Sequence, residues 1–231
     1  MNMKTETIES ITGNVASELN LGRSSVRSVV FVALALWFGV VFLLAAQGAF
    51  VGSANSPPLP IFFGVAIPLA LFLATYFRWK LFRDLILGAD LRFVAAIEAW
   101  RWGGLGFLSL YANGILPGLF ALPAGLGDMA IGISAPWIVL SLVRNRLFAA
   151  SRRFVIWNIL GIADFVVAVS TATLSSGAFP GINALIGGNV TTSPMTRLPL
   201  VLIPAFMVPF FTMLHLTALF QARQLARTRR S

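Results

Sequence analysis

A single carboxylate stands in the middle of an apolar stretch of the sequence. Asp164 lies between Phe154 and Leu174, in a run built mainly from hydrocarbon side chains. Counting ~1.5 Å per helical residue from the basic pair Arg152-Arg153 places Asp164 about 16 Å into a hydrocarbon core about 30 Å thick. A charge there costs about 2.5–3.5 kcal/mol on insertion scales. Asp164 must therefore face protein, a partner or a wet cavity, or carry a proton, so a proton site and a helix-to-helix contact are both open.

The only histidine of the chain falls at a similar depth. His215 lies before Arg223 in the last apolar run, and the same count places it about 12 Å from the boundary. If the two helices are neighbours, an Asp164–His215 pair in the inner half of the core can bind and release protons. The structural alternative is a hydrogen-bonded core histidine.

Two more charged residues extend this candidate polar core. Asp128 is expected about 24 Å above the inner boundary, one or two turns above Asp164, where it can also serve as an N-terminal carboxylate favoured by the helix dipole. Arg101 could complete a polar line through the bundle or extend its charge to the membrane surface. Glu98, three residues earlier, is expected to form an interfacial ion pair with Arg101.

Small residues and prolines are predicted to shape the helices around these groups. Gly161 shares a stripe with Asp164, and Gly132 and Pro136 share one with Asp128, so these two faces are expected to pack closely. Interior prolines remove backbone donors and bend helices. They are Pro68, Pro136, Pro204 and Pro209.

The sequence argues against several kinds of chemistry. It has no cysteine, so thiol catalysis, disulfides and thiolate metal sites are excluded. The only lysines, Lys4 and Lys80, lie outside the apolar runs, which excludes a retinal Schiff base, and one histidine cannot supply a bis-histidine haem. No nucleotide-binding or hydrolase motif is present. We therefore expect no metal and no cofactor, and favour a protein without catalytic activity over an enzyme.

The composition is that of a polytopic membrane protein. Hydrophobic residues make up 58% of the 231 residues, charged residues make up 11%, and the mean hydropathy is +0.85. The net charge of +9 comes from arginines clustered between apolar runs, a pattern typical of membrane topology signals. The lipid bilayer is therefore the expected partner, and nucleic acid is not.

The apolar runs predict an all-α fold with six transmembrane helices. A polar segment at 1–27 and a basic tail at 223–231 are expected to flank them, and an amphipathic helix at about 84–98 is expected on the inner face. The uncharged loop at 175–196 is either a plain loop or partly re-entrant. The spans are expected at about 29–51, 61–77, 99–119, 127–143, 154–174 and 198–221.

The charge distribution predicts the topology. With six spans, all of the 17 lysines and arginines except Arg197 fall on the side of the termini, so both termini are expected in the cytoplasm. Only two of these 17 residues are lysine, a bias typical of GC-rich genomes. We therefore expect a bacterial cytoplasmic membrane.

Two functions from different classes fit these observations. The first is a small transporter or permease-like protein, linked to protons through Asp164, whose solute the sequence does not define. The second is a non-catalytic structural or accessory subunit of a membrane complex, in which Asp164 and the small residues only hold helices together. The small-residue stripes also allow a homo-oligomer without requiring one.

Overall fold

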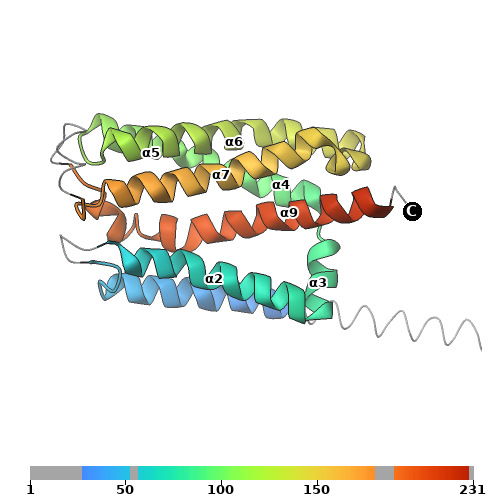
Figure 1. The fold of residues 1–231 in the computed structure, drawn as a ribbon, viewed down its shortest axis with the longest axis horizontal. Coiled ribbons are helices and arrows are strands. Elements are labelled where there is room, and N and C mark those ends of the chain that lie inside the picture. The colour runs from blue at the N-terminus through green and yellow to red at the C-terminus, as the bar shows by residue number, and fades with distance from the viewer. Residues whose placement is uncertain (1–27, 53–56, 180–189, 229–231) are drawn as a thin grey trace, which may run out of the picture.

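The protein is a bundle of long apolar helices. The computed structural model describes residues 28–52, 57–179 and 190–228, and within these ranges it is helical and contains no strand. Five helices are long and apolar enough to cross a membrane, which indicates a membrane protein. They run alongside one another (Figure 1). These helices are Ser28–Ala46, α2 (Leu59–Arg78), α6 (Gly118–Arg144), α7 (Arg152–Leu174) and Ile203–Thr228, which joins η4 (Ile203–Met207) to α9 (Val208–Thr228).

Parts of the expected organisation lie outside the described residues. These parts are the polar segment 1–27, the last three residues of the basic tail and residues 180–189 of the loop that was expected to be plain or re-entrant.

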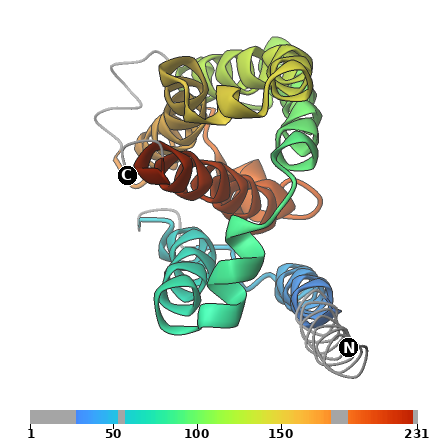
Figure 2. The same cartoon turned by 90° about the vertical axis from the view of Figure 1, so that its right-hand side faces the viewer.

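A segmented helix follows α2 and precedes α6 in the sequence, and it packs beside α6. It consists of α4 (Leu91–Ile97), the 3-10 helix η1 (Glu98–Gly104) and α5 (Leu105–Ala112), in direct succession. The short α3 (Lys80–Leu87) lies across the end of the bundle and leads into it (Figures 1 and 2).

This arrangement differs from the amphipathic helix expected at 84–98. The chain leaves the helical conformation after Leu87, and Asp90 caps the next helix by accepting a hydrogen bond from the Arg92 amide at 2.9 Å. Hydrogen bonds from the Arg92 side chain also lower the pKa of Asp90 to about 2. Val94 and Ala95 are then buried in the bundle instead of facing the membrane surface. The polar cap, which the apolar periodicity did not reveal, sets this boundary.

The spans expected at 99–119 and 127–143 leave a turn between them at about 120–125, but this stretch is helical in the structure. α6 begins directly after Pro117, contains Pro123 and continues to Arg144. Ala121 and Ala124 are fully buried, and a Cβ on Gly125 would overlap Leu108 of α5. The small residues that suggested a turn instead let α6 pack closely on α5.

The last helix forms the centre of the bundle. Viewed from one end, α9 lies between the pair of α2 and the Ser28–Ala46 helix on one side and the remaining helices on the other (Figure 2). Tyr76 of α2 stacks on Phe220 of α9 with ring centroids 4.1 Å apart. Gln221 of α9 donates hydrogen bonds to the carbonyls of Ile86 at 2.8 Å and Ala89 at 3.0 Å, which holds the turn between α3 and α4.

Replacing Gln221 should therefore destabilise this end of the bundle. A Gln221→Leu variant leaves two carbonyl groups without their donor, and we expect a loss of about 1–3 kcal/mol, measured as a lower midpoint of thermal unfolding in detergent. Gln224→Leu is the matched control because Gln224 is exposed on the same helix. Equal midpoints for the two variants would contradict this role.

A buried arginine–carboxylate cluster and its cavity

The guanidinium of Arg101 is buried at the centre of the bundle. Arg101 lies on η1, and its side chain is 1% exposed. Its Nε donates to Asp128 Oδ1 of α6 at 2.7 Å, and its Nη2 donates to Asp164 Oδ2 of α7 at 2.5 Å. The ring of Phe165 covers the guanidinium, with its centroid 4.0 Å from Cζ. One cation therefore joins three segments of the chain.

The same guanidinium binds the histidine of α9. Its Nη1 lies 2.9 Å from His215 Nε2 and donates to the Gly161 carbonyl at 3.3 Å. Because an arginine only donates hydrogen bonds, Nε2 must be the acceptor and carries no proton. Arg101 thus uses four of its five N–H groups within the protein.

A buried amide fixes the other nitrogen of the ring. Nδ1 of His215 lies 2.9 Å from Asn158 Oδ1, while the Asn158 amide nitrogen donates to the Phe154 carbonyl at 2.8 Å. Asn158 therefore presents its oxygen to the ring, so Nδ1 must carry the proton. His215 is held as a neutral imidazole protonated at Nδ1, with Nε2 directed toward the cluster.

Glu98 completes the cluster but forms no hydrogen bond. Its side chain is 1% exposed, and Oε2 lies 3.3 Å from His215 Nε2 and 3.7 Å from Arg101 Nη1. Neither carboxyl oxygen has a hydrogen-bond partner among the described residues. Such a group is costly to bury unless it is neutralised.

The cluster contains more acid than base. Three carboxyl groups face one guanidinium and one neutral imidazole, and within the described residues no second lysine or arginine pairs with them. Full ionisation would leave two excess negative charges inside the bundle. In a low-dielectric site such an excess requires protons or a bound cation.

Glycines make this convergence sterically feasible. A Cβ on Gly161 would overlap the His215 ring, and a Cβ on Gly127 would overlap the Asp164 carboxylate. A Cβ on Gly132 would collide with the backbone of Trp102, next to Arg101. Each glycine therefore lets a helix approach a polar side chain or the segment that carries it.

The structure brings together all four residues of the predicted polar core, Asp164, His215, Asp128 and Arg101. Two details differ from expectation. Asp128 and Asp164 bind the same guanidinium, so they lie at one level and not one or two turns apart. The expected depths were counted from Arg144 for Asp128 and from the Arg152-Arg153 pair for Asp164, as if these arginines lay at equal depth. Gly161 faces α9 and Gly132 faces η1, so the two predicted stripes do not pack only on each other.

Two members of the cluster were missed. Glu98 was expected at the membrane surface because the span was placed to begin after it, although the segmented helix begins at Leu91. Asn158 lies six residues before Asp164, and a polar amide in an apolar run was the signal that could have identified it.

The predicted prolines lie within helical segments, and the expected bends are not tested by their positions alone. Pro136 lies inside α6, and Pro204 lies in the π-helical turn of η4. Pro209 is the second residue of α9.

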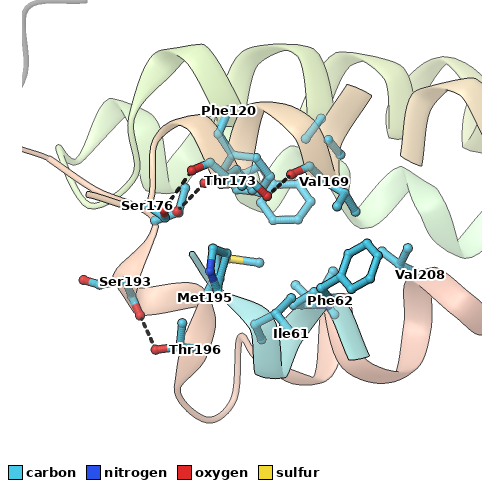
Figure 3. Close-up of a pocket in the computed structure, with 18 of the residues that line it drawn as sticks. Ile61, Phe62, Phe120, Val169, Thr173, Ser176, Ser193, Met195, Thr196 and Val208 are labelled. Carbon is cyan, nitrogen blue, oxygen red and sulfur yellow. Dashed lines mark hydrogen bonds between the residues drawn. The ribbon is translucent and has the colours of Figure 1, made fainter. Parts of the chain in front are cut away.

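A cavity of about 270 Å³ reaches the cluster from the end of the bundle where α2 begins and α7 ends. Thr173, Ser176 and Met195 line its middle and outer part (Figure 3). At its inner end lie Asp128 and Phe165. Asp128 is the one member of the cluster that also lines the cavity, because the Phe165 ring lies between the cavity and Arg101.

These features define an all-helical membrane protein with a buried ionic cluster beneath a cavity. The described residues contain no group of three histidine, cysteine or acidic side chains arranged to hold a metal ion. The chain belongs to the family described as "Domain of unknown function (DUF8737)", whose model matches residues 57–223. All members of the cluster lie within that range. No curated protein and no solved structure matches the chain.

The tautomer of His215 can be checked directly, since the chain has one histidine. In protein labelled with ¹⁵N at histidine, we expect the nitrogen spectrum at neutral pH to show an imidazole protonated at Nδ1 alone. Asn158→Leu removes the acceptor of that proton and should mix the two tautomers. A wild-type ring protonated at Nε2 would contradict the assignment.

Adding one methyl group at Gly161 should disrupt the cluster. In a Gly161→Ala variant the His215 ring must move away from Asn158 and Arg101, so we expect a loss of about 1–3 kcal/mol in thermal unfolding. Gly106→Ala is the control, because a Cβ there meets no atom within 4 Å. A Gly161→Ala protein as stable as this control would show that the ring has room to spare.

Proposed function

We propose that this protein is a small proton-linked transporter of a bacterial cytoplasmic membrane, with the Arg101 cluster as its proton site. The observation that supports this most is the position of Asp128, which belongs both to the cluster and to the wall of the cavity. A solute in the cavity can therefore sense the charge state of the cluster through one shared carboxylate.

The proposed topology has six spans and both termini in the cytoplasm. The segmented helix at 91–112 is added to the five long helices as a further span, the third in chain order. Its α-helical and 3-10 segments together extend about 36 Å, which is enough to cross the hydrocarbon core. The arginines at the ends of α2 and α6 and at the start of α7 then face the cytoplasm. The cavity opens toward the opposite side of the membrane.

The acid excess is the reason to assign a proton. Two excess negative charges cannot be retained in hydrocarbon, so the charge of the cluster must change together with the binding of protons or other cations. Glu98 and His215 Nε2 face each other at 3.3 Å without a hydrogen bond between them. A proton on the Glu98 carboxyl would remove one of the excess charges and turn that group into a hydrogen-bond donor.

The accessory-subunit hypothesis is supported by a different observation. Arg101 joins η1 to α6, α7 and α9, so the cluster also acts as a clasp at the centre of the bundle. A clasp needs the ionic contacts to persist, whereas a transporter needs them to exchange with protons. Titration of the cluster separates the two functions.

Infrared spectroscopy of the protein in lipid can measure this titration. We expect a carboxyl-stretch band that appears and disappears reversibly as the pH is varied between about 5 and 9. Asp164→Asn and Glu98→Gln should each alter the band, because both side chains contact Arg101, and His215→Ala should shift it.

Asp90→Asn is the matched control for these variants. Asp90 is an exposed capping residue of α4, and an asparagine retains the cap. A band that does not change with pH, together with a lower unfolding midpoint in Asp164→Asn, would refute the proton site and favour the accessory-subunit hypothesis.

A further inference from the structure

Apolar and aromatic side chains form much of the lining of the cavity above the cluster. Phe107 of α5 and Phe120 of α6 contact each other edge to face at 5.4 Å and line it together with Phe165. Hydroxyl groups line its outer part (Figure 3). Its volume, about 270 Å³, lies just below the range of about 300–1,000 Å³ that is usual for drug-sized ligands. The cavity therefore suits a small molecule with an apolar body.

The charged residues of the cavity lie at its two ends. Asp128 is at the inner end, and its hydrogen bond to Arg101 uses Oδ1, so no protein donor binds Oδ2 in the described residues. Arg197, the other charged lining residue, is exposed at the outer end, next to η3 (Ser193–Thr196). A ligand that reaches the inner end passes aromatic rings along the cavity and meets the Asp128 carboxylate beside the Phe165 ring. A carboxylate beside aromatic rings is a combination that attracts organic cations.

The buried acid behind Asp128 strengthens this preference. Glu98 is unpartnered and 1% exposed, and Asp164 shares the Arg101 guanidinium with Asp128. One guanidinium cannot neutralise three carboxylates, so a positive charge beside Asp128 would offset part of the excess. A negative ligand at that position would add to it.

We propose that the cavity binds a small monovalent organic cation with an apolar body, and that Asp128 is its counterion. This inference rests on the proposed proton-linked function and adds the class of solute. A cation at Asp128 and a proton on the cluster neutralise the same excess charge, so each disfavours the other. Entry of one cation then releases one proton, which is the coupling of a cation–proton exchanger.

Calorimetric titration with three aromatic probes tests the solute class. Benzyltrimethylammonium carries a permanent positive charge, benzyl alcohol is uncharged and benzenesulfonate is negative. We expect the wild-type protein in lipid nanodiscs to bind the cation at least about tenfold more tightly than either of the others. Asp128→Asn should remove this preference, and Asp90→Asn should retain it.

A second pair of variants tests the cavity without altering the cluster. Thr173 lines the cavity, and its hydroxyl bonds only within α7, to the Val169 carbonyl. Thr173→Phe should fill the cavity and weaken cation binding by at least about tenfold, even if Asp128→Asn fails to fold. Ser170→Phe, at an exposed position of the same helix that does not line the cavity, should bind as the wild type does.

The outcomes for the solute class and for proton linkage are separable. Equal affinity for cation and alcohol, tighter binding of the sulfonate, or cation binding that survives in Asp128→Asn would each overturn the cation site. Repeating the titration in buffers of different ionisation enthalpy measures the protons released. Cation binding without proton release would support the site and refute the proton linkage, whereas a pH-dependent carboxyl band without cation binding would refute the site alone.

Discussion

The structure depends on one guanidinium that is held away from water. Arg101 is charged at any relevant pH. Its side-chain partners lie on three different helices: Asp128 on α6, Asp164 on α7 and His215 on α9. Because an unpaired cation at this depth would be very costly, the three helices must converge on η1. The directional N–H groups of the guanidinium also fix where each helix stops along its neighbour, which apolar side chains in lipid do only weakly.

The backbone conformation and the small residues give the helices enough room to converge on Arg101. Carrying Arg101 on a 3-10 segment between α4 and α5 changes the direction in which consecutive side chains point, so Glu98 and Arg101 both face inward. Gly127, Gly132 and Gly161 then let α6 and α7 approach the polar groups closely. The packing at these glycines is tight, because a methyl group at any of them would overlap a cluster residue or the segment that carries Arg101.

Much of the helical layout follows from the apolar pattern, and the parts that do not are set by single polar residues. The run around Asp164 predicts α7 to within two residues, because its ends are marked by arginines and by a polar loop. The third span was predicted to begin too late, because apolar periodicity alone continues a single helix through residues 84–98. In the structure Asp90 caps a new helix, α4, which begins at Leu91. The prediction therefore placed Glu98 at the membrane surface, whereas the structure buries it in the core. Residue identity did predict four of the five charged or titratable members, Arg101, Asp128, Asp164 and His215, since each is expensive in hydrocarbon. Contact between distant helices cannot be counted along a chain.

The number of acids in the cluster bears on which function the protein performs. A clasp between helices is complete with one carboxylate for each guanidinium, and every further buried charge adds about 2.5–3.5 kcal/mol on insertion scales. Glu98 makes no hydrogen bond among the described residues that would offset this cost. Asp128 lines a cavity, and only its Oδ1 accepts a hydrogen bond from Arg101. A purely structural cluster would gain stability if both were replaced by apolar residues of similar size. Their presence supports the proposal of a site that exchanges positive charge, in which Arg101 holds the carboxylates in place while protons or a cation complete the balance.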